Sequence, residues 1–564
     1  MPLAAQKVPV TEKTLANGMR VLLVQRNDEP TVSGGWVAHV GSANERPGIT
    51  GIAHLFEHMM FKGTPTIGTK DYEKDQKIIG EQELVREEMR QEEVKIRAAW
   101  RRGAIDDPQK PENKTAHYKE LEKKFADLVT KQRELLVKNE FDRIYTTGGA
   151  SGMNAFTSDD MTAYFITVPA NKLELWMWMK SERILRPVFR EFYAERDVVF
   201  EERRMRTEAT PQGRIEEAYS AMFWESHPYG WPTVGWPSDI PAISKKQADE
   251  FYKLYYAPQN LTLILVGDFQ MANAVSLAEK YFTRIPRGLD AAPDVVTTEI
   301  PQAAEKRMVG EAEANPSVDI CWHTTPFGHP DSAALQVLAQ IFSGRTGRLY
   351  KGLVLGKEVA TQAYGQQISK KWAGLFNAGG EPKDGIVPEE VEKAIYAEIE
   401  KVQQAEVPAQ ELQKVKNNFA ASEYRRLSGN TAIMFQLISV DGNGDWREIN
   451  EGGKKIQAVT AADVQRVAKK YFTQVNRAVL ITTRKASSKA AVTGDLSTLP
   501  ADQQAVIRKI AGALQAETSV DKLKQSLKQM DEQAGTAPAK SKPFLTLRRK
   551  LIEDRIAELQ KEKK

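Results

Sequence analysis

Two histidines and a glutamate lie close together in one apolar segment, GIAHLFEHMMFKGT, at residues 51–64. The apolar spacing predicts a helix, so His54 and His58, four residues apart, project from one face. Two such imidazoles can bind a single Zn²⁺, with about 2.0–2.1 Å from the metal to each nitrogen. Glu57 shares that side and is placed to take a proton from a water whose pKa zinc has lowered to about 7. The plainer alternative is a packed histidine pair beside a carboxylate, but unpaired polar side chains among apolar residues are costly.

A catalytic zinc needs a third protein ligand and an open coordination position. The segment ERDVVFEE supplies carboxylates on a second predicted helix, over about residues 191–207. Glu195 and Glu202 are seven residues apart, or two turns, so they face the same way. One of them can bind the metal while the other supports a ligand, whereas Glu201 points elsewhere and is the weaker choice. The order H-x-x-E-H is that of the inverted zincin signature.

The sequence around these motifs predicts a zinc-binding α/β domain over residues 1–285. The expected elements are strands within 14–40, at 162–168 and at 260–268, and helices at 52–60, from 171 and over 191–207. Residues 74–141 are rich in charged residues, and apolar residues recur there with coiled-coil spacing. They predict an inserted charged helical hairpin, which is either a solvated spacer or a docking arm.

The remaining sequence repeats this order without a second zinc motif. A proline-containing stretch without periodicity, 286–302, is interpreted as an interdomain linker, and a homologous domain is expected over 303–484. The predicted fold class is therefore α+β: two homologous α/β sandwich halves facing each other, each with an antiparallel or mixed sheet packed with helices. Residues 485–564 are expected to form a helical tail. Its amphipathic pattern is carried by Leu545, Ile552, Ile556 and Leu559.

Composition narrows the partners and the compartment. A net charge of +4 with 27% charged residues creates no strong field of one sign, so no nucleic-acid partner is indicated. No apolar run reaches the roughly 18–20 residues of a membrane span, and the single cysteine, Cys321, cannot form an internal disulfide. The start, MPLAAQKVPVTEK, lacks the apolar region of a secretory signal. Residues 4–6, AAQ, resemble the first residues after a signal-cleavage site, so a periplasmic location is expected if an export signal has been removed; otherwise the compartment is open.

Four motifs in order, HLFEHMMFKGT, NAFTSDDMTAYF, ERDVVFEE and HPYGWPTVGWPSDI, resemble those of the pitrilysin and insulysin superfamily of zinc metallopeptidases. The resemblance is strongest to the branch of the processing peptidases and their bacterial relatives. It implies that His54, His58 and Glu202 bind Zn²⁺, that Glu57 is the general base, and that Glu195 is an additional acidic residue of the site. The interval between His58 and Glu202 is longer than in relatives because of the hairpin. A surface insertion leaves ligand geometry intact, since closure entropy grows slowly with loop length.

In that superfamily the segment matching MNAFTS forms a sheet edge beside the metal, where an extended substrate adds as a strand. The resemblance therefore implies that Asn154, Ala155 and Phe156 bind substrate. Backbone hydrogen bonds hold any extended peptide, and side-chain pockets select among peptides. The expected activity is zinc-dependent endopeptidase hydrolysis of extended or unfolded peptides.

Members of the superfamily whose second half helps catalysis carry an Arg and a Tyr there, seven residues apart, and these positions align with Val354 and Thr361 here. Neither side chain donates hydrogen bonds as Arg and Tyr do, and Arg348 and Tyr364 stand in other registers. The resemblance therefore implies a homologous partner subunit that supplies the Arg/Tyr pair, or a homodimer. The alternative function is a non-catalytic core, assembly or peptide-binding subunit of the same fold, against which the intact H-x-x-E-H argues.

Overall fold

The computed structural model describes residues 7–485 and, in the tail, 499–500, 503–504, 506–507, 510–511, 514, 519–534 and 542–561. These residues form two compact units. One consists of the chain up to Gly310 with Pro316–Thr482, and the other of Glu311–Asn315 with the chain from Thr483. The AAQ segment, on which the expectation of export depended, lies outside the described residues. None of the helices described combines the length and apolar content that crossing a bilayer requires.

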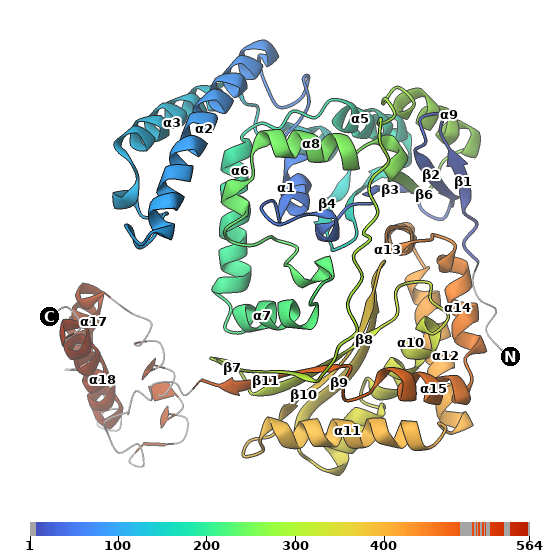
Figure 1. The fold of residues 1–564 in the computed structure, drawn as a ribbon, viewed down its shortest axis with the longest axis vertical. Helices are drawn as coiled ribbons and strands as arrows, with labels where there is room; N and C mark the ends of the chain where they lie inside the picture. Colours follow the sequence, from blue (N-terminus) through green and yellow to red (C-terminus); the bar gives the residue numbers. More distant parts are fainter. Residues whose placement is uncertain are drawn as a thin grey trace. The chain divides into compact units, whose positions relative to one another are not determined.

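The first half of the larger unit is built on a six-stranded mixed sheet (Figure 1). Its strands are β1 (Thr11–Thr14), β2 (Arg20–Gln25), β3 (Thr31–Ala38), β4 (Ser151–Thr157), β5 (Thr162–Pro169) and β6 (Leu261–Gly267). They lie in the order β1-β2-β6-β3-β5-β4, with β2 and β6 parallel and the other neighbours antiparallel. Strands β2, β3 and β6 are buried over most of their length, which explains their continuous apolar sequences. The sheet has two edge strands, β1 and β4.

Helices of this half cover one face of the sheet and share one hydrophobic core with it. They are α1 (Ile52–Met59), α5 (Leu173–Leu185), α6 (Phe192–Arg203), α8 (Lys245–Tyr255) and α9 (Met271–Phe282). A further helix, α7 (Gly213–Phe223), comes after α6 and a short π-helical turn. The helix that carries the two histidines is therefore packed between the sheet and α6.

The second half repeats the topology of the first. Its strands are β7 (Lys306–Ala312), β8 (Ser317–Thr324), β9 (Ala360–Ser369), β10 (Gly374–Pro382) and β11 (Arg477–Arg484). Its helices are α10 (Ser332–Phe342), α11 (Pro388–Gln404), α12 (Ala409–Arg426), α13 (Asn430–Asn443), α14 (Glu448–Ala458) and α15 (Ala461–Tyr471). The strand order β7-β11-β8-β10-β9 is the order β2-β6-β3-β5-β4 with each strand replaced by its counterpart in chain order. The predicted fold of two related α/β halves is confirmed.

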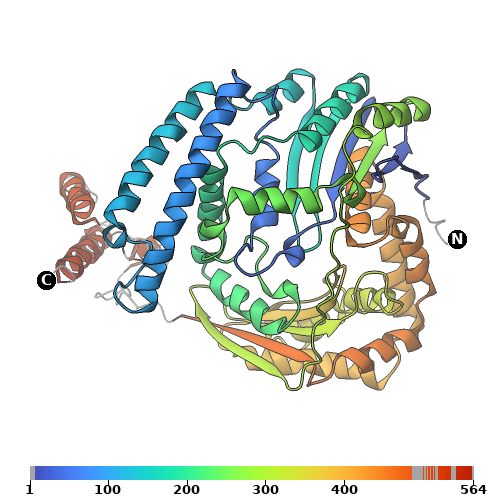
Figure 2. The same cartoon turned by 45° about the horizontal axis from the view of Figure 1, so that its top comes forward.

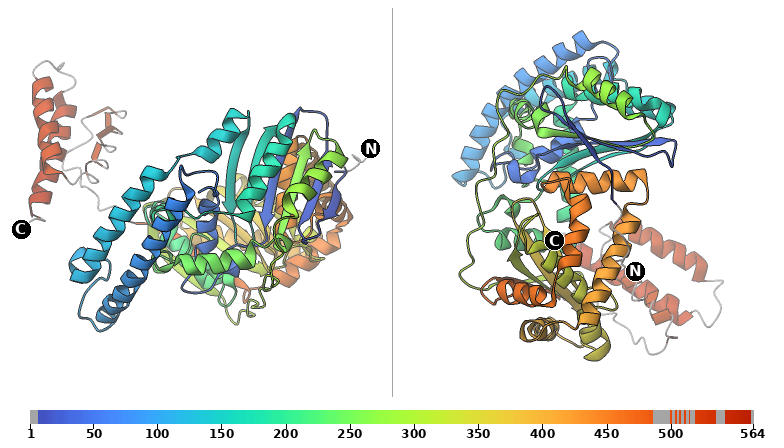
Figure 3. Two further views of the ribbon diagram at one scale, coloured as in Figure 1. Left: turned by 90° about the horizontal axis from the view of Figure 1, so that it is seen from above. Right: turned by 90° about the vertical axis from the view of Figure 1, so that its right-hand side faces the viewer.

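The two halves exchange a helix. Helix α13 of the second half packs on the free face of the first sheet, where Met434 and Ile438 join the core formed by Leu22 and Ile264. Helix α7 of the first half packs on the second sheet, and the hydroxyl of Tyr219 donates to the carbonyl of Ala478 at 2.8 Å. The right-hand view of Figure 3 shows the first sheet above the second half. Each half therefore completes the core of the other.

Two histidines at the contact between α7 and the second sheet predict a loss of stability in acid. The ring of His323 stacks on that of Phe223, with centroids 3.9 Å apart, and burial lowers the pKa of both His323 and His227 to about 4. The unfolded chain takes up these protons below about pH 6.5, so the folded state binds fewer protons and the free energy of unfolding falls as the pH falls from about 6.5 towards 4.

The measurement is urea unfolding between pH 7 and 4. In His323→Leu the loss of stability per pH unit should shrink by up to about 1.4 kcal/mol, the value of one proton. The exposed His117, changed to Gln, is the matched control and should leave the slope as in the parent. An unchanged slope in His323→Leu would show that this ring already carries its proton when folded.

The predicted charged hairpin corresponds to α2 (Tyr72–Arg101), α3 (Ala116–Leu135) and the beginning of α4 (Glu140–Thr147). In Figure 2, α2 and α3 run side by side along the first half. Both helices begin at side-chain caps: Asp71 accepts from the backbone of Lys74 at 3.1 Å, and Thr115 from that of Tyr118 at 3.0 Å. A narrow apolar seam of Val85, Met89, Leu121 and Leu128 joins them. This seam is the physical basis of the coiled-coil spacing.

The predicted linker has no regular secondary structure, and the predicted tail contains helices. Among the described residues, 286–302 form neither helix nor strand, and Glu299 within them accepts backbone hydrogen bonds from Glu225 and His227 at 2.8 and 2.9 Å. In the smaller unit, α17 (Val520–Ala534) and α18 (Lys542–Lys561) form a pair in which Ile552 and Leu559 are buried. The apolar side of the predicted amphipathic tail helix is therefore the side that packs within that unit.

Candidate metal centre and active site

Helix α1 is held in place by close backbone contacts at its beginning. Gly51, at φ 91°, precedes the helix, and a Cβ there would lie 2.5 Å from the carbonyl oxygen of Val234. Gly235, at φ 90°, belongs to the same neighbouring segment, so both positions favour glycine. The carboxylate of Glu45 accepts from the backbone nitrogens of Gly51 and Ala53, each at 2.8 Å. The segment HPYGWPTVGWPSDI therefore fixes where α1 begins.

The structure brings three of the predicted residues together where α1 faces α6. The Nε2 atoms of His54 and His58 lie 3.7 and 3.3 Å from Oε2 of Glu202, and the three ligand atoms are all within 4.8 Å of one another. Zinc bonds of 2.0–2.2 Å at tetrahedral angles place neighbouring donor atoms about 3.3–3.6 Å apart. Two imidazole nitrogens and one carboxylate oxygen at these separations fit a zinc ion. No second group of this kind occurs in the part of the chain that the structure describes.

Glu195 does not belong to the three-residue cluster but contacts one of its members, His58. Its Oε1 is 2.9 Å from Nδ1 of His58, and its Oε2 is 2.5 Å from Nζ of Lys62. Holding Nδ1 orients the ring of His58 so that Nε2 points to Glu202. On the other side, Arg206 pairs with Oε1 of Glu202 at 2.7 Å and leaves Oε2 facing the histidines. Both carboxylates are thus oriented by neighbouring cations.

The two imidazoles differ in their electrostatics. Burial lowers the pKa of His54 to about 3, helped by the neighbouring His58, so its ring is neutral and able to bind a metal at neutral pH. Burial also lowers the pKa of His58, but the hydrogen bond and charge of Glu195, with Glu202, outweigh it and raise the pKa overall. The pKa of Glu195 falls to about 2, because the interactions with His58 and Lys62 exceed the opposing effect of burial. Because the pKa of His58 is raised, protons compete with a metal ion for this ring more strongly than for an ordinary histidine, and metal binding weakens as the pH falls.

Glu57 is on α1 between the two histidines. Burial raises its pKa, although the hydroxyl of Thr157 donates to its Oε2 at 2.7 Å and partly opposes this rise. A carboxylate with a raised pKa, held by one hydrogen bond beside a metal cluster, is suited to accept a proton near neutral pH and to give it up again. Thr157 stands at the end of the edge strand β4.

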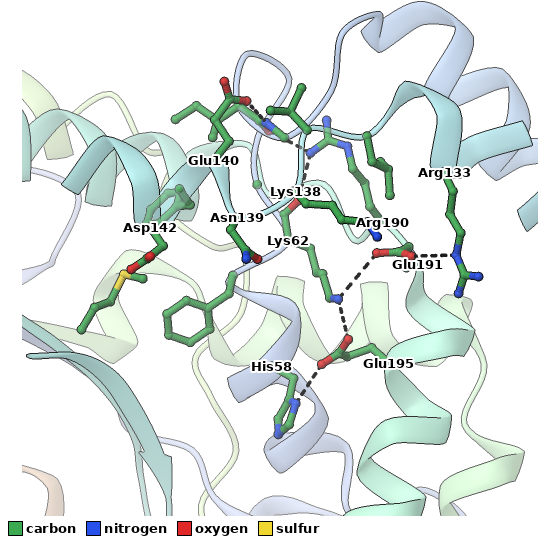
Figure 4. A pocket seen from close by; sticks show the side chains of 18 of the residues that line it. His58, Lys62, Arg133, Lys138, Asn139, Glu140, Asp142, Arg190, Glu191 and Glu195 are labelled. Carbon is green, nitrogen blue, oxygen red and sulfur yellow. Dashed lines mark hydrogen bonds and ion pairs between the residues drawn. The ribbon is translucent and has the colours of Figure 1, made fainter. Parts of the chain in front are cut away.

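A pocket of about 790 Å³ opens beside Glu57 and His58. Figure 4 shows the charged chain along it: His58 contacts Glu195, Glu195 contacts Lys62, Lys62 reaches Glu191 at 3.8 Å, and Glu191 meets Arg133 at 3.4 Å. The end of the hairpin and residues 136–142 form the opposite wall. The insertion therefore helps to shape the space next to the candidate catalytic residues.

Arg190 connects the beginning of α2 to the loop that follows α1. Its guanidinium donates to Asp75 at 2.6 Å and to the carbonyls of Lys62, Thr64 and Ile67 at 2.7–3.1 Å. Asp75 belongs to α2, so a single buried arginine ties the root of the hairpin to the loop after α1. The pocket floor is thus fixed by a buried ion pair with additional hydrogen bonds, the arrangement in which such a pair is tolerated.

The three residues expected to bind substrate are placed differently from one another. Asn154 lines the pocket, and its own side-chain oxygen accepts from the backbone of Ala155 at 2.9 Å. Ala155 is buried in the core, while Phe156 packs on the other face of the sheet near Phe165, with centroids 6.3 Å apart. Of the three side chains only that of Asn154 lines the pocket. Any contribution from the other two comes through the backbone of the edge strand.

In the second half, the residues considered for an Arg/Tyr pair are either unable to act as such donors or already engaged in other contacts. Val354 packs against the second core, and Thr361 donates to the carbonyl of Glu381 at 3.3 Å. Arg348 forms a two-pronged pair with Glu411 at 2.6 and 2.9 Å. Tyr364 donates a hydrogen bond to Asp319. Neither Arg348 nor Tyr364 replaces the missing pair.

Three residues of the site are not indicated by the sequence patterns: Thr157, Lys62 and Arg206. The first two lie inside two of the four motifs, NAFTSDD and HLFEHMMFKGT. Both are polar residues close in sequence to predicted site residues, and this proximity is the one feature of the sequence that could have indicated them. Arg206 comes four residues after Glu202, which is a helical ion-pair spacing. What the sequence does not contain is the distance from Thr157 to Glu57, which depends on how β4 lies against α1.

The contact between Glu195 and His58 predicts the effect of changing Glu195 to Gln. The amide keeps the shape but removes the charge that orients His58, so zinc affinity should fall about 10- to 100-fold, the usual cost of losing a supporting residue. The measurement is competition with a zinc chelator of known affinity. Glu191→Gln, which removes a charge from the same helix end without touching His58, is the control. Equal affinity in Glu195→Gln and the parent would remove Glu195 from this role.

Comparison with solved structures defines the class of fold. The crystal structure of a protease from Helicobacter pylori superposes with a TM-score of 0.68 at 24% identity, over 85% of this chain and 100% of that one. The crystal structure of pitrilysin gives a TM-score of 0.61 at 15% identity, over 85% of this chain and 46% of that one. The fold is therefore that of the two-halved, pitrilysin-like proteins.

Sequence comparison identifies the family. The model described as "Insulinase (Peptidase family M16)" matches residues 20–83 and 121–235, and that described as "Peptidase M16 inactive domain" matches 242–419. Zinc protease PqqE of Helicobacter pylori is 27% identical over 472 residues, which are 81% of this chain and 89% of that protein. YmxG of Bacillus subtilis, described as an uncharacterized zinc protease, is 21% identical over 476 residues, or 82% and 95%. The chain belongs to the M16 family of insulinase- and pitrilysin-like peptidases, as the four motifs predicted.

Proposed function

We propose that this chain is a zinc metalloendopeptidase whose metal is held by His54, His58 and Glu202. The observation that carries the proposal is the spacing of these three donors, 3.3 and 3.7 Å from carboxylate to imidazoles, which suits a tetrahedral zinc ion. The similarity to proteins named zinc proteases supports the same metal. Glu57, with its raised pKa, supports hydrolysis rather than metal storage.

The residues divide the chemistry of peptide hydrolysis between them. A zinc ion bound here would supply Lewis acidity, lowering the pKa of a water molecule and polarising the scissile carbonyl. Glu57 takes the proton from the attacking water and returns it to the leaving amine. Thr157 holds the Glu57 carboxylate in place at 2.7 Å, and Glu195 keeps His58 in the orientation that presents Nε2. Arg206 neutralises the outer oxygen of Glu202.

The edge strand β4 supports a preference for extended or unfolded peptides. Among the strands that the structure describes, β4 pairs only with β5, and its residues Met153 and Asn154 line the pocket beside Glu57. An extended peptide that adds to this edge places its backbone next to the metal cluster through main-chain hydrogen bonds. Folded proteins offer no such free strand and should be poor substrates.

We further propose that the chain acts as the zinc-bearing subunit of a dimer with a homologous partner, or with a second copy, that supplies an Arg/Tyr pair. Support comes from the second half, where Val354 and Thr361 occupy the corresponding positions. The purified chain at concentrations where it is monomeric should cleave a quenched, extended peptide slowly, and the rate should rise when the partner is added. Full activity of the isolated monomer would reject the partner while leaving the zinc peptidase in place.

A second candidate is a non-catalytic core, assembly or peptide-binding subunit, which is favoured by the match of residues 242–419 to a domain described as inactive. That match covers most of the second half, which does not contain the metal cluster. The match is therefore also compatible with a chain whose first half is active and whose second half supports it. Peptide binding without turnover, in the presence of zinc and partner, would favour this alternative.

A relative in Escherichia coli is described as the periplasmic protease PqqL, and we propose the same compartment for this chain.

A further inference from the structure

A second pocket, of about 430 Å³, lies between the helical hairpin and α6. Most of its wall comes from residues 84–120, the part of the hairpin that the insulinase family model passes over. On α6 it is lined by Arg196, Asp197 and Phe200. Arg196 and Phe200 point away from the side that carries Glu195 and Glu202, because 3.6 residues make one turn. The pocket is therefore a feature of the insertion and is distinct from the candidate metal site.

Positive charge predominates in this pocket and is poorly compensated. Arg86 and Arg196 are only 6% and 7% exposed, and both stack on the ring of Tyr193, at 4.9 and 5.1 Å from its centroid. The contacts of Arg86 are long, 3.3 Å to Glu93 and 3.5 Å to a methionine sulfur. Those of Arg196 are also long, 3.3 Å to the carbonyl of Ile243 and 3.5 Å to Asp197, a carboxylate of the pocket that is largely exposed to solvent. Within the described chain, the Nε atoms of both arginines have no hydrogen-bond partner.

The neighbouring charges do not restore the balance. Glu93 is shared between Arg86 at 3.3 Å and Arg97 at 3.9 Å, and Lys114 on the rim is paired with Glu122, which does not line the pocket. Two buried guanidinium groups close to each other repel, and burial together with the charge of Arg86 lowers the pKa of Arg196. Buried cations normally have a charged partner. Two carboxylates line this pocket, Glu93 and Asp197, against four cations, and this excess of positive charge favours binding of a further anion; the cations are Arg86, Arg97, Lys114 and Arg196.

Several apolar side chains form the rest of the wall, together with the polar residues Gln109 and Ser238. Trp100, 48% exposed at the end of α2, stands at the pocket with Ile96, Pro108, Phe200 and Pro241. An aromatic ring offers stacking area at little cost in conformational freedom. A volume of this size with apolar walls and a few convergent polar groups is typical of a small-molecule site.

We propose that this pocket binds a carboxylate attached to a flat apolar body, with the carboxylate at Arg86 and Arg196 and the ring against Trp100 and Phe200. Two sources share this chemistry: a free arylalkyl acid, and the C-terminal aromatic residue of a peptide. Arginine is suited to either, because its planar fork matches a carboxylate.

The test is calorimetric titration of the full chain with indole-3-acetate as probe. Saturable binding of one molecule per chain is expected. Indole-3-acetamide, which keeps the ring and loses the charge, should bind at least about tenfold more weakly, and acetate should give no measurable heat. Gly-Gly-Trp as free acid and as C-terminal amide form the peptide arm. Binding of the free-acid peptide assigns the peptide C-terminus as a source, and its failure beside binding of indole-3-acetate assigns the small acid.

Three variants separate the contributions. Arg86→Met and Arg196→Met keep much of the side-chain volume and should each weaken indole-3-acetate about tenfold or more while leaving indole-3-acetamide unchanged. Trp100→Ala, on the rim where folding is not at risk, should weaken both ligands. Arg101→Met, exposed on the next position of α2 and outside the pocket, is the control. Equal affinity for acid and amide, or full affinity in Trp100→Ala and in whichever arginine variant folds, would overturn the proposal.

Discussion

Replacing Glu57 by Gln should leave zinc bound and lower kcat/KM by about 10³- to 10⁴-fold. The amide has the shape of the carboxylate and can still accept from Thr157, but it cannot take a proton from water. His54, His58 and Glu202 are unchanged, so the metal content should stay at one per chain. The measurements are metal analysis of the purified variant and cleavage of a quenched, extended peptide.

The control for Glu57→Gln is a substitution that removes the same charge elsewhere. Glu201→Gln suits this purpose, because Glu201 is 60% exposed and pairs with Arg204 at 2.9 Å, away from the cluster. It should cleave at the parental rate. Normal turnover in Glu57→Gln would remove Glu57 from the role of base, and loss of zinc in that variant would make it a ligand instead.

Replacing Glu202 by Ala should abolish tight zinc binding. The two imidazoles would retain the ion with only two protein donors, fewer than the three of catalytic zinc sites. Zinc affinity should therefore fall by more than the roughly 100-fold upper cost of losing a supporting residue, and cleavage should be lost with it. The measurement is the same chelator competition as for Glu195→Gln.

Glu201→Ala is the matched control for Glu202→Ala, since it removes a glutamate one position away on the same helix. Its zinc affinity should equal that of the parent, which would show that general loss of charge on α6 has little effect. If the zinc affinity of Glu202→Ala fell only as far as that of Glu195→Gln, Glu202 would be a supporting residue and not a ligand. Parental affinity would exclude Glu202 as a ligand.

Much of the fold is predictable because it is encoded in local patterns. The continuous apolar runs indicate β3 and β6, the spacing around His54 indicates α1, and the similar strands at the ends of the two halves, β6 and β11, indicate a duplication. The exchange of α7 and α13 between the halves is not predictable. It depends on contacts such as that of Tyr219 with Ala478, which are 259 positions apart in the sequence. No local periodicity records which sheet a helix will cover.

The site shows the same division. Seven-residue spacing indicates that Glu195 and Glu202 share a face, but it leaves open which of them meets the histidines, and only the resemblance distinguishes them. The structure places Glu202 at the Nε2 atoms and Glu195 at Nδ1 of His58. Thr157 and the pocket wall at 136–142 come from segments far away in the sequence. Their approach to α1 depends on the tertiary fold, for example on the hydrogen bonds of Arg190.

Anomalous X-ray diffraction at the zinc absorption edge, on crystals grown with one zinc per chain, tests the central claim most directly. We expect a single strong peak at about 2.0–2.2 Å from Nε2 of His54, Nε2 of His58 and a carboxylate oxygen of Glu202, with a solvent molecule at the fourth position. A peak bound to other residues, or a fully loaded protein with no peak between these three, would contradict it.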